Sequence, residues 1–136
     1  MKKIFIASDH AGYNLKNSVI SKFSKKQKLI DLGPTSSDPV DYPDFAKKLA
    51  RKVSSNKLSL GILICGSGMG MAITANKIKN VRAALCYSNK NTKLSRLHNN
   101  ANIITLGERL ISKNKAINLI KIFLSTKFEG GRHLRR

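Results

Sequence analysis

The sequence is poor in acidic residues, aromatic residues and cysteines. Its 136 residues contain 7 Asp and Glu side chains against 26 Lys and Arg, with two cysteines and no tryptophan. Two cysteines are too few for a disulfide framework, so we expect reduced thiols and a cytoplasmic protein. No apolar run reaches the roughly 18 residues that span a bilayer, and Asp9 and His10 interrupt the short one near the start, which argues against a secretory signal. Length and a 41% hydrophobic content predict one domain over 1–136.

The net charge of +19 raises the question of a nucleic-acid partner, because a cationic surface attracts phosphate. The lysines do not form one block, however, and are scattered over the expected helices: Lys16, Lys22, Lys47, Lys48, Lys52, Lys113, Lys115 and Lys121. Aromatic residues make up only 6% and are not interleaved for base stacking. We therefore expect a solvated basic surface, with neither a dedicated nucleic-acid site nor a membrane partner.

Apolar runs alternate with amphipathic stretches along the chain. Short runs rich in β-branched residues predict strands at 3–8, 28–33, 60–65, 81–86 and 101–107. Apolar residues at helical spacing predict helices at 15–23, about 43–53, 71–78, 91–100 and 115–125. This alternation predicts a parallel sheet with helices on both faces.

The unusual residues follow three of the expected strands. SDHAG follows the first strand, CGSGMG at 65–70 ends the third, and GER at 107–109 ends the fifth. Ligands in such sheets bind beyond the carboxyl ends of the strands, where the strand order reverses. We therefore expect the chemistry of this protein at that edge.

The glycine-rich loop 65–70 is not a known nucleotide motif. It lacks the Gly-Lys-Ser/Thr of a Walker A loop, and its glycine spacing and position do not fit a dinucleotide fingerprint. Its backbone N–H groups, at the start of a helix, would suit a bound or developing anion. A buried hydrophobic role would be ordinary for Cys65, but this position favours a thiolate. Cys86 has no such loop and is interpreted as structural.

Two histidines stand beside these features. His10 follows Asp9 at the end of a strand, and His98 lies among polar residues with no apolar stripe to join. Asp, His and Cys side chains do not form a clustered ligand spacing, so the sequence does not predict a zinc site. Nucleophilic hydrolysis by a Cys-His pair stays open on this reasoning.

Eight short stretches carry a family resemblance. In order, they are SDHAG, DYP, GILICGSGMG, ANK, RAA, SRLHNNAN, LGER and EGGRH. In this order and spacing, from about residue 3 to the last, the sequence resembles the RpiB/LacAB sugar-phosphate isomerases. The resemblance implies a three-layer α/β/α, Rossmann-like fold with a five-stranded parallel sheet. It also implies a homodimer whose active sites draw on both subunits, and no metal or other cofactor.

The implied reaction interconverts ribose 5-phosphate and ribulose 5-phosphate through an enediolate. In the family pattern Cys65 is the base, so the thiolate serves basicity and not attack. The backbone N–H groups of Gly66, Gly68 and Gly70 then suit the enediolate oxygens, and Ser67 supplies a hydroxyl.

The family pattern also assigns the substrate contacts. His98 helps to open the furanose ring, with Asp9 and Tyr42 near the sugar and Asn99 matched to substrate oxygens. The phosphate-binding set is His10, Arg109, Arg132 and Arg136. Guanidinium groups suit that task because they bind two phosphate oxygens at fixed geometry. We expect a turn at Gly130-Gly131 to fold the tail 128–136 back over the phosphate.

The sequence departs from the family pattern in three places. Asn100 stands where aspartate is common, Ser67 replaces a threonine, and the chain stops at Arg136 where many members continue. The third departure bears on how Arg136 is held and on assembly, for which a tetramer stays open beside the dimer. Allose 6-phosphate or galactose 6-phosphate is an alternative substrate. A non-catalytic sugar-phosphate or nucleic-acid binding module is a further alternative, against which the presence of Cys65 and His98 argues.

Overall fold

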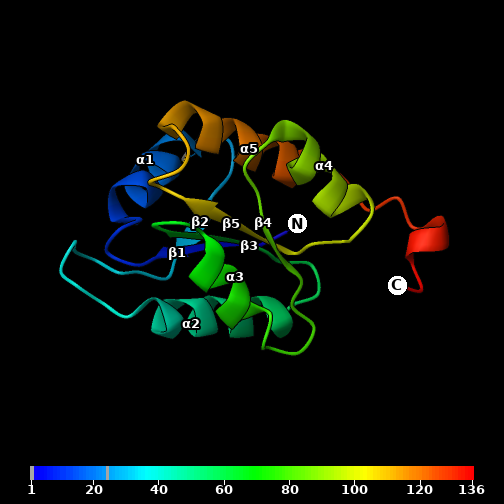
Figure 1. The fold of residues 1–136 in the computed structure, drawn as a ribbon, viewed down its shortest axis with the longest axis horizontal. Coiled ribbons are helices and arrows are strands. Elements are labelled where there is room, and N and C mark those ends of the chain that lie inside the picture. The colour runs from blue at the N-terminus through cyan, green and yellow to red at the C-terminus, as the bar shows by residue number, and fades with distance from the viewer. Residues whose placement is uncertain (1, 24) are drawn as a thin grey trace.

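The chain forms a five-stranded parallel sheet between two layers of helices (Figure 1). The structure is a computed structural model that describes residues 2–23 and 25–136. Its strands are β1 (Ile4–Ser8), β2 (Leu29–Asp31), β3 (Leu60–Cys65), β4 (Ala83–Leu85) and β5 (Ile103–Gly107). Its helices are α1 (Tyr13–Phe23), α2 (Tyr42–Ser54), α3 (Met69–Ala75), α4 (Asn89–Leu97), α5 (Lys113–Ser125) and the short 3₁₀ helix η1 (Gly131–His133).

The strand order explains where a ligand can bind. It is β2-β1-β3-β5-β4, with every neighbouring pair parallel. The helices α1, α4 and α5 cover one face, whereas α2 and α3 cover the other (Figure 1). The chain moves outward from β1 to β2 and then returns to β3 on the other side of β1, so the order reverses between β1 and β3. The three-layer α/β/α fold expected from the sequence is confirmed.

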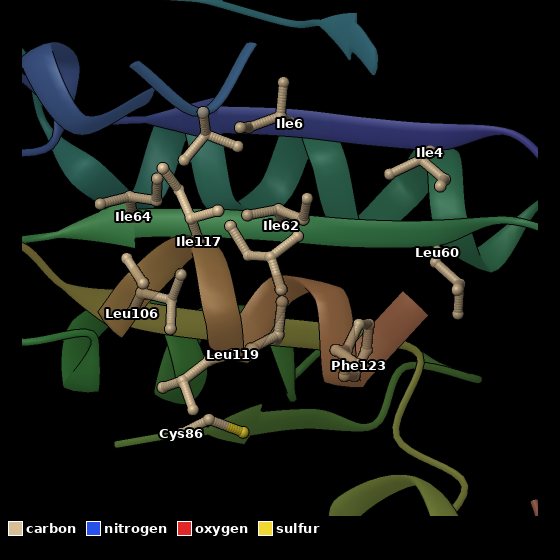
Figure 2. Packing of buried hydrophobic residues seen from close by; sticks show 14 of the residues in the cluster. Ile4, Ile6, Leu60, Ile62, Ile64, Cys86, Leu106, Ile117, Leu119 and Phe123 are labelled. Carbon is tan, nitrogen blue, oxygen red and sulfur yellow. The ribbon is translucent and has the colours of Figure 1, made fainter. Parts of the chain in front are cut away.

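Two apolar clusters hold the layers to the sheet, one on each face. Ile62 and Ile64 of β3 pack with α1 and α5, and Figure 2 shows them beside Ile117 of α5. Leu63 and Cys65 alternate to the opposite face and pack with residues of α2 and α3. The side chain of Cys65 therefore belongs to the thinner, two-helix layer.

Four elements end earlier than the sequence predicted, and one of them is the strand expected at 28–33, which is β2 and ends at Asp31. The helix expected at 71–78 is α3, which ends at Ala75 because Asn76 uses its side chain to bind the next strand. The Asn76 amide donates to the Ala83 carbonyl (2.9 Å) and accepts from the Ala83 N–H (2.7 Å). The strand expected at 81–86 is the short edge strand β4, and the helix expected at 91–100 ends at Leu97.

One lysine that was expected on the solvated surface is buried. The side chain of Lys16 has no exposed surface and forms an ion pair with Asp31 (Nζ to Oδ1, 2.9 Å). Its ammonium group also donates to the Pro34 carbonyl (2.7 Å). Helical spacing places Lys16 beside the apolar residues of α1, and a buried charge requires such partners. Lys16 thus ties α1 to β2 and to the start of the loop that leads to α2.

Among the described residues, no helix has both the length and the apolar character that a membrane crossing requires.

Candidate active site

The first group of expected site residues gathers at the carboxyl ends of β1, β3 and β5. Backbone hydrogen bonds connect the three segments where the strands end. The Asp9 N–H donates to the Ile64 carbonyl (3.2 Å), and the Arg109 N–H donates to the Gly66 carbonyl (3.0 Å). Because these bonds extend the sheet beyond its last paired residues, the loops after the three strands are held against one another.

The thiol of Cys65 lies inside the glycine-rich loop. Its side chain is buried, and its Sγ accepts a hydrogen bond from the Gly68 N–H at 3.1 Å. Gly68 has a φ of 78°, a left-handed conformation that glycine adopts without strain. The next hydroxyl, Ser67 Oγ, accepts the Met69 N–H at 3.2 Å. These two bonds fix the sulfur and the hydroxyl within the loop.

Two larger side chains lie directly against this loop. A Cβ on Gly70 would lie 2.6 Å from the Tyr42 ring, and a Cβ on Gly66 would lie 3.0 Å from Nη1 of Arg109. Glycine at these two positions therefore lets the tyrosine and the guanidinium approach the backbone. Tyr42 comes from the first turn of α2 and is partly exposed. The loop is thus bordered by an aromatic ring on one side and by a cation on the other.

Asp9 and His10 are fixed by the turn that follows β1. Asp9 is buried, and its Oδ1 accepts the Gly12 N–H at 3.0 Å. Nδ1 of His10 lies 3.1 Å from the Val40 nitrogen and 3.2 Å from the Val40 carbonyl oxygen, so it accepts from the first or donates to the second according to its tautomer. Either bond fixes the ring, and His10 is exposed beside the loop.

The second group of expected residues lies at the opposite edge of the sheet. Helix α4 begins just beyond the carboxyl end of β4 and runs back, so His98 and Asn99 at its end lie near the amino ends of the strands. The Glu129 N–H donates to the Leu97 carbonyl (3.1 Å) and attaches the tail to the end of α4. Figure 1 shows the tail on the far side of the sheet from the loops that follow β1 and β3.

The tail is folded, as the sequence predicted. Gly130 and Gly131 have φ values of 74° and 56°, and the turn that they make leads into η1. Arg132 and Arg136 are exposed. Arg136 lines a small cavity together with Asn99 and Asn100 at the end of α4.

A cluster of His98, Glu129 and His133 was not anticipated from the sequence. The two imidazole rings are stacked, with centroids 4.3 Å apart and planes 16° from parallel. The Glu129 carboxylate lies 4.0 Å from Nε2 of His98 and 3.9 Å from Nε2 of His133. Burial, the nearby charge of His98 and that of Arg132 lower the pKa of His133, while Glu129 opposes the shift. The EGGRH stretch contained this histidine, but no periodicity marked it as buried.

The same cluster is the one group among the described residues whose ligand atoms lie close enough for a metal ion, within 4.8 Å of one another. A metal lies in the plane of each imidazole that binds it. The rings of His98 and His133 are stacked with nearly parallel planes, so a metal ion near both rings would not lie in the plane of each. The arrangement therefore does not fit a metal ion shared by both histidines.

Glu108 and Arg82 hold parts of the expected site in place, although neither was among the predicted site residues. The Glu108 carboxylate accepts the Leu15 N–H at 2.7 Å, which fixes the start of α1 beside the strand ends. At the other edge, Nε of Arg82 donates to the Asn99 carbonyl at 2.6 Å. Both residues lie in stretches that the sequence analysis quoted, LGER and RAA, but their roles were not predicted because each acts through a contact between distant parts of the chain.

The expected site is therefore divided within one chain. Its first group, at the carboxyl edge, is Asp9, His10, Tyr42, Cys65, Gly66, Ser67, Gly68, Gly70 and Arg109. Its second group, at the amino edge, is His98, Asn99, Arg132 and Arg136. A single chain does not bring Cys65 and His98 together.

A thiol in a glycine-rich loop, at the switch point of a doubly wound α/β sheet, stands where the ligands of such sheets bind. Residues 4–136 match the family described as Ribose/Galactose Isomerase, and the chain belongs to this family.

Named relatives are similar over nearly the whole chain. The probable ribose-5-phosphate isomerase B of Mycoplasma pneumoniae is 48% identical over 136 residues, which cover 98% of this chain and 89% of the relative. The structure of Clostridium thermocellum ribose-5-phosphate isomerase B superposes with a TM-score of 0.96 at 44% identity, covering 100% of this chain and 92% of the other. The Mycoplasma genitalium enzyme, solved with bound ribulose-5-phosphate, has a TM-score of 0.95 at 46% identity, covering 99% and 91%.

Proposed function

We propose that the protein is an aldose–ketose isomerase that interconverts ribose 5-phosphate and ribulose 5-phosphate. The named relatives that share its fold and 37–48% of its sequence support this substrate. The hydrogen bond from the Gly68 N–H to Cys65 Sγ carries the assignment of the base. It holds the sulfur against a backbone donor at the edge of the sheet where ligands bind, which suits a residue that takes a proton from the substrate.

The proposed reaction moves one proton between two carbons. The Cys65 thiolate takes the proton from C2 of the open-chain aldose, and the C–H electron pair forms the C1–C2 double bond. The carbonyl oxygen on C1 becomes the enediolate oxygen, which accepts hydrogen bonds from the loop that includes Gly66, Gly68 and Gly70, with the Ser67 hydroxyl beside it. The thiol returns its proton to C1 as the C2 hydroxyl loses its proton to the oxygen on C1. The thiolate is regenerated as the ketose forms.

The second group of residues acts, on this proposal, from another subunit. His98 lies at the end of α4, across the sheet from Cys65 of the same chain. We propose a homodimer in which His98 of the partner subunit protonates the ring oxygen of the closed sugar, and Asp9 accepts the proton of the C1 hydroxyl. Asn99 binds sugar oxygens from the same side as His98, with Tyr42 opposite.

The substrate phosphate is held, on this proposal, by cations from both edges. His10 offers its imidazole and Arg109 its guanidinium at the carboxyl edge. Arg132 and Arg136 of the other chain, both exposed, complete the set. Cations distributed over two subunits would make binding of the phosphate depend on assembly. A cytoplasmic location and the lack of a nucleic-acid partner stay predictions.

The test is incubation of the purified chain with ribose 5-phosphate while the ketose is followed, with a chelator present throughout. We expect ketose formation that the chelator does not reduce. Allose 6-phosphate and galactose 6-phosphate are tested in parallel, because the family covers isomerases of more than one sugar. A higher kcat/KM for either hexose phosphate would replace the proposed substrate, and no turnover of all three would remove the proposed function.

A further inference from the structure

A cavity lined by several cations lies at the amino-terminal edge of the sheet. Its volume is about 620 Å³, within the range of small-molecule sites. The segments that line it come just before the strands: Lys2 before β1, Lys57 before β3 and Arg82 before β4. The loops beyond the carboxyl ends, with Cys65 and His10, do not line it.

The charge of this cavity has one sign. Four cations line it, namely Lys2, Lys57, Arg82 and Arg96, and the described lining residues include no carboxylate. The amides of Asn80, Asn100 and Asn102 add neutral hydrogen-bonding groups. Cations that share a cavity repel one another, and an anion bound between them would relieve that repulsion.

Arg96 gives the cavity a fixed cation. Its side chain is buried, and it donates from Nε to the Thr126 carbonyl (2.9 Å) and from Nη1 to the Ala101 carbonyl. Its guanidinium also lies 5.5 Å from the centre of the Phe123 ring. These partners are neutral, and no ion pair of the described residues involves Arg96. The positive charge is thus held in place without a protein counter-ion.

The electrostatics of Lys2 agree with this geometry. Burial lowers the pKa of Lys2, and the charges of Arg96 and Lys127 lower it further. Each of these effects opposes the charged form of the lysine, and an anion in the cavity would act in the opposite direction.

We propose that this amino-edge cavity is a binding site for a small multivalent phosphate anion of the pyrophosphate class. The buried Arg96 anchors one end of the anion, and Lys2, Lys57 and Arg82 surround the remainder. Two linked phosphate groups match a site with four cations better than a single phosphate does. The proposal does not depend on the isomerase activity.

The cavity adjoins residues of the proposed active site. Arg82 and Asn100 also line a smaller cavity beside Asn99 and Arg136. Pyrophosphate could therefore bind at either place, and the experiment must separate the two.

The probe is pyrophosphate, titrated into the full-length protein at about 0.15 M salt and followed by calorimetry and by ¹H–¹⁵N NMR. We expect saturable binding, with the largest shifts at the amides of Ser59, Leu60 and Val81 of the cavity lining. The double variant Lys2→Gln/Lys57→Gln should bind about tenfold or more weakly, because it removes two of the four charges. The matched control, Lys47→Gln/Lys90→Gln, loses the same charge from exposed positions elsewhere and should change affinity less than about twofold.

The variant Arg132→Ala separates the cavity from the proposed substrate site. Shifts at Ser59, Leu60 and Val81 that persist in Arg132→Ala and weaken in Lys2→Gln/Lys57→Gln support the proposal. Binding that disappears in Arg132→Ala but survives in the lysine variant overturns it. An equal loss in the two lysine variants would indicate general charge attraction and overturns it too, as does no saturable binding up to about 10 mM.

Discussion

The two edges of the sheet carry site residues that are built in different ways. At the carboxyl edge, main-chain hydrogen bonds connect the loops after β1, β3 and β5, and Cys65 and Asp9 are buried among them. At the amino edge, the residues come from the end of α4 and from the tail, and Arg132 and Arg136 are exposed. The carboxyl edge is therefore organised before a ligand arrives, whereas the amino edge offers charged groups that a ligand or a partner can order.

This difference matches the chemistry that each edge is proposed to perform. A base must meet one carbon atom at a fixed distance, which requires rigid surroundings such as those of Cys65. A phosphate is a larger target that several exposed arginines can reach. The following predictions test whether the division into a rigid and an adaptable half holds.

The largest effect is expected at the rigid half. Cys65→Ala should lose about 10²–10⁴ in kcat for ribose 5-phosphate, the range for loss of a general base. The control is Cys86→Ala, since Cys86 is also buried but lies in the apolar cluster between the sheet and α5. Burial raises the pKa of the Cys86 thiol, which keeps it protonated. Steady-state kinetics should show Cys86→Ala near the unmodified protein, and equal activity of the two variants would exclude Cys65 from the mechanism.

The division between two subunits is tested by mixed dimers. A heterodimer of one Cys65→Ala chain and one His98→Ala chain should recover about half of the normal activity, although each homodimer is nearly inactive. One of its two sites then combines an intact Cys65 with an intact His98 from the other chain. The measurement is kcat of heterodimers purified through two different affinity tags.

The matched control places both substitutions on one chain. A heterodimer of a Cys65→Ala/His98→Ala chain with an unmodified chain contains the same two changes, but each site then has one defect. We expect it to be nearly inactive. If this control retains half of the activity and the first heterodimer none, each site is built from one chain and the proposed arrangement is wrong.

The sequence predicted the carboxyl edge better than the amino edge, for physical reasons. Residues just after a buried strand must lie at the strand's carboxyl end, so the position of Asp9, Cys65 and Arg109 followed from the order of elements. The bounds of the short edge strand β4 were harder to predict. Its residues are all half-buried, so they show no alternation of apolar and polar side chains. Its length, and the early end of α3, depend on the contact between Asn76 and Ala83.

Long-range contacts account for what the sequence could not show. Lys16 looked like one more surface lysine because its partners, Asp31 and the Pro34 carbonyl, are remote in the chain. The stacking of His98 on His133 likewise depends on how the tail returns to the end of α4. His98 is far from Cys65 because α4 runs from the carboxyl edge back to the amino edge. The motif residues alone do not reveal the direction of that helix.

A smaller effect is expected at the adaptable half. Arg132→Ala should raise KM for ribose 5-phosphate by about tenfold, because a phosphate contact far from the reacting carbons mainly serves binding. Some loss of kcat is expected as well, since the phosphate anchors the position of the sugar. Arg135→Ala is the control and should change KM by less than about twofold. A chain that ends at Gly131 should resemble Arg132→Ala, and an unchanged KM in that chain would remove Arg132 and Arg136 from the phosphate site.

The smallest effect concerns stability at the amino edge. The folded protein lowers the pKa of His133 below its usual value of 6.5, chiefly by burial and then through the charges of His98 and Arg132. As the pH falls through 6.5, the unfolded chain therefore binds the proton first, and the free energy of unfolding decreases. Thermal unfolding between pH 7.5 and pH 5.5 should show a fall in Tm that is smaller in His133→Asn. His10→Asn, at the exposed histidine of the carboxyl edge, is the control and should keep the full pH dependence. Equal slopes for His133→Asn and the unmodified protein would show that the buried histidine does not couple the fold of the tail to pH.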